Sequence, residues 1–150
     1  DVLRIEKGYI AAGAEVDGRT CPYDLRLDKF LKKDRRCVGF HGLQRPALQR
    51  DDRLQLVGLV SVEEKRPLRE GARIVATKEA RGFGAAIGHV TSAAFSPALG
   101  RHIALALLQR GRTRHGETVY VADPLRDGRK RRPATVTDPV FIDPAGARLR

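Results

Sequence analysis

The sequence predicts a mainly β protein: a small six-stranded antiparallel barrel or sandwich behind a less regular N-terminal arm with one or two short helices. Two observations carry this prediction. From Leu54 onward, short runs of β-branched and apolar residues alternate with turn residues at close spacing. The preceding residues are broken instead by Gly, Pro and runs of charge. The sequence therefore divides into residues 1–50, the arm, and residues 51–150, a β-barrel domain.

Regular structure in the arm is expected to be short. Residues 3–6 alternate apolar and charged side chains, and on an extended segment Arg4 and Glu6 would face the same side. Three further segments are interpreted as a brief helix, a solvated charged loop and a weak one-sided helix: residues 23–30, 32–36 and 42–50. Pro46 interrupts the last of these, because proline removes a backbone donor inside a helix.

Six strands are expected after the arm. They cover residues 54–62, 72–76, 85–94, 102–109, 117–121 and 134–142. The fourth is rich in Ala and Leu, so its pattern is also compatible with a helix. Residues 67–71 are expected to form a turn before the second strand, residues 111–116 a polar turn before the fifth, and residues 123–132 a long charged hairpin loop before the sixth.

The composition is that of a globular protein of one domain. The chain has 150 residues, of which 41% are hydrophobic and 31% charged. No apolar run approaches the roughly 18 residues of a membrane span, and the N-terminus lacks the apolar region of a signal peptide. We therefore expect a cytoplasmic protein with no membrane partner. Because the chain contains no Met, we also expect it to be a piece of something longer.

The chain is strongly basic, with a net charge of +11 and 29 Lys and Arg residues. Such a charge fits nucleic-acid binding, since phosphate contacts dominate that affinity. However, the arginines are spread along the whole sequence, and aromatic residues make up only 5%, which leaves few platforms for stacking bases. A nucleic-acid partner is therefore not the preferred interpretation.

No pattern of catalytic or metal-binding residues stands out. Residues 82–88 nearly form the dinucleotide-binding GxGxxG motif, but the third Gly falls one position late and a strand follows instead of a helix. The histidines form no paired spacing, and Ser92 and Ser96 have no neighbouring acid or base. Cys21 and Cys37 belong to no CxxC pair. We expect no catalytic residue, no metal and two reduced thiols.

Arg4 and Glu6 allow two interpretations on residue type alone. A surface ion pair between the two side chains is the simpler one. The alternative is a binding role for Arg4, because its planar guanidinium can hold a carboxylate with two parallel hydrogen bonds.

Two long segments resemble a known family. Residues 87–108 read IGHVTSAAFSPALGRHIALALL, similar to the GHVTSA-x-x-SP-x-LG-x-x-IALA signature of the C-terminal barrel of the glycine-cleavage T-protein (aminomethyltransferase) superfamily. Residues 3–25 read LRIEKGYIAAGAEVDGRTCPYDL and resemble its LR-x-EKGY motif. Together with the ending TDPVFIDPAGARL, they look most like the C-terminal region of the α subunit of heterotetrameric sarcosine oxidases. Residues 27–30, Leu-Asp-Lys-Phe, depart from the family's Gly-rich pattern.

The resemblance implies a role in one-carbon metabolism. In this family tetrahydrofolate captures the one-carbon unit released by amine demethylation, and upstream domains supply most of the folate cleft. It implies that residues 1–50 end a folate-binding region and that Arg4, Glu6 and Tyr9 contribute to the folate site. NAD and flavin would bind elsewhere in the parent complex, with the upstream domains and the other subunits as partners. An aminomethyltransferase piece, or a basic β-barrel module that binds RNA or protein, remains the alternative.

Overall fold

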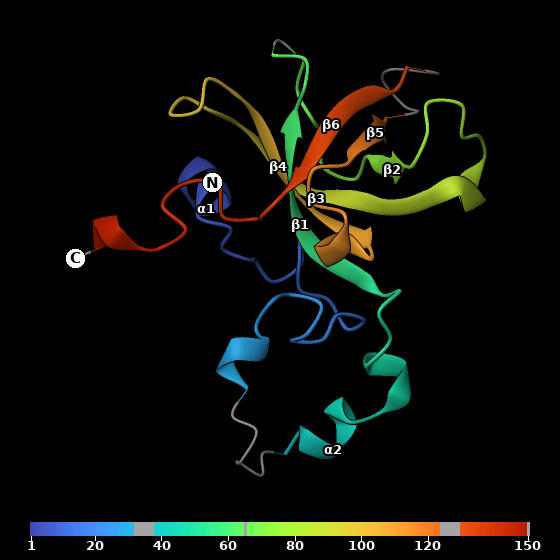
Figure 1. The fold of residues 1–150 in the computed structure, drawn as a ribbon, viewed down its shortest axis with the longest axis vertical. Helices are drawn as coiled ribbons and strands as arrows, with labels where there is room; N and C mark the ends of the chain where they lie inside the picture. Colours follow the sequence, from blue (N-terminus) through green and yellow to red (C-terminus); the bar gives the residue numbers. More distant parts are fainter. Residues whose placement is uncertain (32–37, 65, 124–129, 150) are drawn as a thin grey trace.

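The chain, described by a computed structural model, has the predicted fold class: a closed barrel of six antiparallel strands and an N-terminal arm (Figure 1). The structure describes residues 1–31, 38–64, 66–123 and 130–149. The strands are β1 Leu54–Ser61, β2 Arg73–Val75, β3 Ala86–Ser96, β4 Arg101–Gln109, β5 Thr118–Ala122 and β6 Arg132–Thr137. They follow each other around the barrel in the order β1-β4-β3-β2-β5-β6, and β6 pairs with β1 to close it.

The helices are all short. Two are α-helical, α1 Val2–Glu6 and α2 Phe40–Leu43, and single 3-10 turns occur at η1 Asp28–Phe30, η2 Pro46–Leu48, η3 Phe83–Ala85, η4 Gly111–Thr113 and η5 Ala147–Leu149. The extended interpretation of residues 3–6 is therefore wrong, and the brief helix at residues 23–30 shrinks to η1. The charged loop at residues 32–36 lies outside the described residues. In the described part of the chain, no helix is long and apolar enough to cross a membrane.

The last strand ends earlier than its sequence suggests. β6 stops at Thr137 rather than at residue 142. Pro139 cannot donate to a ladder, and the Asp138 carboxylate accepts a hydrogen bond from Val140 N at 2.9 Å. The chain then leaves the barrel, and the amides of Phe141 and Ile142 donate to Glu6 O at 2.9 and 3.0 Å. The C-terminal segment is thereby attached to α1.

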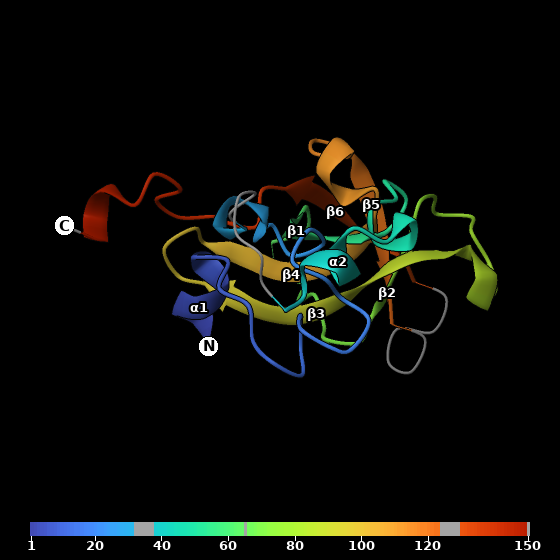
Figure 2. The same ribbon diagram turned by 90° about the horizontal axis from the view of Figure 1, so that it is seen from below.

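Strand β4 is buried on both faces, which explains its unbroken apolar sequence. Alternate side chains of a strand point to opposite faces. Ala104, Ala106 and Leu108 belong to the barrel interior, packed with residues such as Leu59 and Ile74. The alternate residues of β4 pack outside the barrel against the arm, in a second cluster: Ile5, Leu25, Leu56, Ile103, Leu105 and Leu107. The arm is thus one layer of the core, and β4 separates it from the barrel interior. Figure 2 shows α1 beside the ends of β3 and β4.

Hydrogen exchange should separate the barrel from the arm. The barrel residues Leu56, Val75, Val90, Ile103, Val119 and Val136 have little or no exposure, so their amides should open only on global unfolding. The amides of residues 1–31 are held by short turns and should exchange at least tenfold faster on average. Exchange measured by NMR checks this, and equal protection of both parts would contradict a division near residue 50.

Candidate functional site

The arm is joined to the barrel by a buried carboxylate. Glu15 has no exposed surface, and four donors surround it. Its Oε1 accepts hydrogen bonds from Thr91 Oγ1 at 2.7 Å and Ser92 Oγ at 2.6 Å, and its Oε2 accepts from Ala11 N at 2.9 Å and Arg4 Nη1 at 3.1 Å. We call these five residues the Glu15 clasp. Because both oxygens are fully paired, the burial cost of the charge is offset within the clasp.

A β-bulge in β3 brings both hydroxyls of the clasp to the same carboxylate. In a regular strand, Thr91 and Ser92 would point to opposite faces. Here Val90 pairs with Ala106 and Ser92 with Leu105, so Thr91 is an extra residue in the ladder. Bulges re-aim side chains in this way. The TS pair of the HVTSA stretch is therefore the receptor for Glu15.

The clasp keeps Glu15 ionised. Burial by itself raises the pKa of this carboxyl, but the hydrogen bonds from Ser92, Ala11 and Thr91, together with the charge of Arg4, outweigh burial. The pKa of Glu15 is therefore held below its ordinary value. A carboxyl with a lowered pKa stabilises the fold above its unfolded-state pKa, and the contribution is lost as the pH falls.

The stability contributed by Glu15 should depend on pH. At neutral pH, Glu15→Gln should lower the free energy of unfolding, because the charged partner of Arg4 is gone. The difference from the wild type should shrink as the pH falls below about 4, where the wild-type carboxyl becomes protonated too. Urea unfolding between pH 3 and 7 measures this, and a difference independent of pH would contradict it. The remaining acid sensitivity comes from other carboxyls whose pKa is lowered: Asp17, Asp28, Asp52, Asp138 and Asp143.

The predicted pair of Arg4 and Glu6 does not form, because α1 turns the two side chains to different partners. Arg4 binds Glu15, and also donates to Tyr9 O at 2.9 Å and Ser92 Oγ at 2.8 Å. Its side chain keeps 23% of its surface exposed. Glu6 is buried, and accepts a hydrogen bond from Ser96 Oγ at the end of β3.

Tyr9, the third predicted site residue, lies on a groove between the arm and the barrel. The groove has a volume of about 810 Å³, and the Tyr9 side chain is exposed. We call it the arm groove. Its aromatic, aliphatic and charged lining comprises Tyr9 and Phe30; Ile10, Leu25, Leu27, Leu56 and Val140; and Lys7, Arg26, Asp28, Lys29, Arg112, His115 and Asp138.

Ion pairs fix most charged residues of the arm groove. Arg112 Nη2 lies 2.8 Å from Asp28 Oδ1, Lys7 Nζ lies 3.3 Å from Asp143 Oδ2, and Arg26 pairs with Asp138. Arg26 holds a left-handed backbone conformation with φ of 60°, which costs energy for a side chain other than glycine. The wall of the groove formed by residues 26–30 is thus attached to η4 and to the segment after β6.

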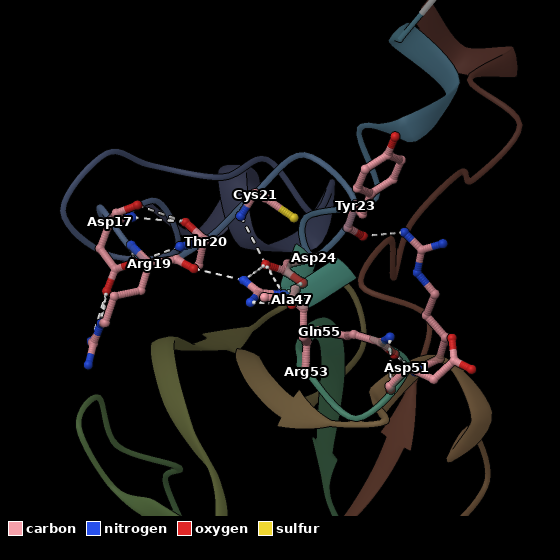
Figure 3. A network of polar contacts seen from close by, with 11 residues as sticks. Asp17, Arg19, Thr20, Cys21, Tyr23, Asp24, Ala47, Asp51, Arg53 and Gln55 are labelled. Carbon is pink, nitrogen blue, oxygen red and sulfur yellow. Dashed lines mark hydrogen bonds and ion pairs between the residues drawn. The ribbon is translucent and has the colours of Figure 1, made fainter. Parts of the chain in front are cut away.

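A second buried carboxylate, that of Asp24, holds the chain just before this wall in place. Asp24, only 3% exposed, accepts hydrogen bonds from Arg53 Nε at 2.9 Å and Arg53 Nη2 at 2.6 Å, and from Cys21 N at 2.9 Å. Arg53 also donates to Arg19 O at 2.8 Å. In Figure 3, Asp24 and Arg53 lie at the centre of a network that reaches from Asp17 to Gln55. The start of β1 and the loop before the groove are therefore held together.

The serines, the glycine-rich segment and the cysteines singled out in the sequence form structural contacts or lie outside the described residues. Ser92 and Ser96 hydrogen-bond to Glu15 and Glu6, as given above. In residues 82–88, η3 leads directly into β3, with no helix at the position where a phosphate-binding motif has one. Cys21 is buried, whereas Cys37 lies outside the described residues. Among the described residues, no group of three His, Cys, Asp or Glu side chains could hold a metal ion.

Glu15 is the residue that sequence reasoning missed. It was part of the EKGY-containing stretch, but no local pattern distinguishes it from an exposed acid, since its partners Thr91 and Ser92 lie far away in the sequence. The one available signal was the pair of consecutive hydroxyls inside an apolar strand, which need a polar partner when buried.

The fold and the clasp define a small barrel domain with an N-terminal arm docked on it. Residues 55–143 match the family of the glycine cleavage T-protein C-terminal barrel domain, and the chain belongs to this family. The resemblance seen in the sequence is thereby confirmed. A solved structure of glycine cleavage system aminomethyltransferase T from Bartonella henselae has the same fold, with a TM-score of 0.78 and 24% identity, covering 95% of this chain and 38% of that one.

Within the family, the chain is similar to sarcosine oxidase α subunits. It is 42% identical over 99% of its length to the sarcosine oxidase subunit alpha of Rhizobium meliloti (strain 1021), and 38% identical over 98% to that of Corynebacterium sp. (strain P-1). An aminomethyltransferase of Moorella thermoacetica is 34% identical over 81%. The chain spans only 15% of the length of either sarcosine oxidase subunit and 31% of the aminomethyltransferase.

Proposed function

We propose that this chain is the C-terminal part of a sarcosine oxidase α-type subunit, where it helps to form the site at which tetrahydrofolate captures the one-carbon unit of the demethylated amine. The observation that carries the proposal is the 42% identity to such a subunit over 99% of the chain. The match covers the arm as well as the barrel. It therefore includes the residues of the clasp and of the arm groove. In this proposal upstream domains complete the folate cleft, other subunits complete the enzyme, and NAD and flavin bind outside these residues.

The proposed contribution of this chain is to bind and orient folate. Arg4, Glu6 and Tyr9 are the proposed site residues, with different duties. Tyr9 offers an exposed ring at the arm groove, 56% accessible, suited to contact a planar ligand. Arg4, whose side chain keeps 23% of its surface exposed, would pair with a carboxylate of the ligand. Glu6 is proposed to support the segment, through Ser96 and the two amides that its carbonyl accepts.

A folate titration of the full-length protein tests the assignment of Arg4. Arg4→Ala should weaken binding of 5-formyltetrahydrofolate about tenfold or more, because a charge-assisted hydrogen bond is lost. Oxidation of sarcosine without folate should stay nearly unchanged. Arg4→Lys should restore only part of the affinity, since an ammonium lacks the planar fork. Calorimetric titration measures the dissociation constants.

Two variants separate ligand binding from stability. Glu15→Gln removes the internal partner of Arg4 and should lower the melting temperature, as Arg4→Ala should too. Arg19→Ala removes a side chain that is 87% exposed and should change neither quantity. If Arg4→Ala lowers the melting temperature but leaves folate affinity at the wild-type value, Arg4 has only a structural role and its assignment is wrong.

A further inference from the structure

One cation of the arm groove has no anionic partner in the described part of the chain. Lys7, Arg26 and Arg112 are each paired with a carboxylate, as described above. The Lys29 ammonium group lies over the Phe30 ring, whose centroid is 5.2 Å from Nζ. Phe30 itself is 69% exposed. An exposed ring and a surplus positive charge therefore stand together on one wall of an 810 Å³ groove.

We propose that this wall, formed by Lys29 and Phe30, is a binding subsite for the part of the ligand that combines an aromatic ring with a carboxylate. Phe30 would contact the ring by stacking or edge-to-face packing, and Lys29 would pair with the carboxylate. The inference rests on the proposed function, in which the ligand is a folate: its benzoyl ring carries a glutamyl group with two carboxylates. Tyr9 provides a second exposed ring in the same groove.

The wall is a built feature, because long-range contacts fix its position. Asp28 and Arg26, on either side of Leu27, are paired with Arg112 and Asp138, more than 80 residues away in the sequence. The strained φ of Arg26 is retained within this arrangement, and strain of this kind concentrates at ligand sites. A pre-positioned wall loses less conformational freedom when a ligand binds.

Two substitutions in the full-length protein test the subsite. Phe30→Ala should weaken the binding of 5-formyltetrahydrofolate about three- to tenfold, the range for lost aromatic contacts. Lys29→Gln should weaken it roughly fivefold at low salt and less at 0.5 M salt, as expected for an exposed ion pair. The matched controls are Lys78→Gln, which removes an exposed charge between β2 and β3, and Phe95→Leu, which changes a ring on β3 that is 45% exposed. Both should bind folate as the wild type does.

Two smaller probes show which part of folate the subsite contacts. Tetrahydropterin has the bicyclic ring of folate but neither the benzoyl ring nor a carboxylate, so its affinity should be unaffected by either substitution. 4-Aminobenzoylglutamate has the missing part, and its binding should weaken in both variants. If 5-formyltetrahydrofolate binds and neither variant weakens it, the subsite is wrong while the proposed function stands. If no reduced folate binds the wild type at all, the proposed function fails.

Discussion

Glu15→Ala should destabilise the protein by about 3–4 kcal/mol, the largest effect expected of any single substitution in the arm. The substitution removes the buried carboxylate partner of Arg4, which keeps only its contacts with Asp1, Tyr9 O and Ser92 Oγ among the described residues. It also removes the acceptor from the Ser92 hydroxyl and the Ala11 N–H, whereas the Thr91 hydroxyl keeps Leu105 O at 3.0 Å. Breaking a buried ion pair by removing one partner costs about 3–5 kcal/mol, and each buried donor left unpaired adds to the loss. For a chain of this length, the melting temperature should fall by roughly 10 °C.

Thermal and urea unfolding, followed by circular dichroism, measure this effect. Glu63→Ala is the matched control: Glu63 is 42% exposed and its ion pair is with Arg66, itself 50% exposed, so its loss should cost less than about 0.5 kcal/mol. Glu15→Gln should fall between the two, because an amide keeps the shape and one acceptor. A loss below about 1 kcal/mol in Glu15→Ala would mean that the clasp does not hold the arm.

Gly88→Ala should destabilise the barrel by about 3 kcal/mol. Gly88, on β3, lies against β4, and a Cβ atom there would sit 2.3 Å from Leu107 O and 3.0 Å from Leu108 Cα. Both atoms belong to the backbone of the neighbouring strand, so relief requires the two strands to separate. Overpacking a closely packed region costs typically 1–3 kcal/mol and sometimes more. The Gly of the GHVTSA stretch is thus needed for space.

Gly84→Ala is the control within the same segment. A Cβ at Gly84 meets no atom within 4 Å, so the free energy of unfolding should change by less than about 1 kcal/mol in either direction. Urea unfolding of both variants at neutral pH decides the point. Equal stability of Gly88→Ala and the wild type would show that β3 and β4 can move apart freely, contrary to their close pairing.

The barrel could be predicted from the sequence, because strand signals are local. All six strands were placed, and the boundaries differ by a few residues except at β6. There the sequence pattern ran on to residue 142, whereas Pro139 and the attachment of the following residues to α1 end the strand earlier. The ambiguous pattern of β4 has a tertiary cause: the strand lies between the barrel interior and the arm, so both of its faces are apolar.

The site was much less predictable, because its contacts are long-range. Arg4 was recognised as a residue that needs a partner, but the expected partner was two positions away, and the observed one is Glu15. The receptor for Glu15 depends on a bulge at Thr91, which no local propensity indicates. The arm groove is formed by segments from both ends of the chain, so the sequence revealed only Tyr9 as one of its members.

We propose that this chain belongs to an enzyme that transfers the methyl carbon of an amine to folate. The most direct measurement is ¹³C NMR of the products when the full-length protein, assembled with its subunits, oxidises sarcosine labelled with ¹³C in its N-methyl group, with tetrahydrofolate present. Dimedone is added to trap any formaldehyde that escapes, since free formaldehyde combines with tetrahydrofolate without an enzyme. We predict that most of the label appears in methylenetetrahydrofolate despite the trap, and that Arg4→Ala shifts it to the dimedone adduct. If the wild type gives label only in the dimedone adduct, the proposed transfer to folate is wrong.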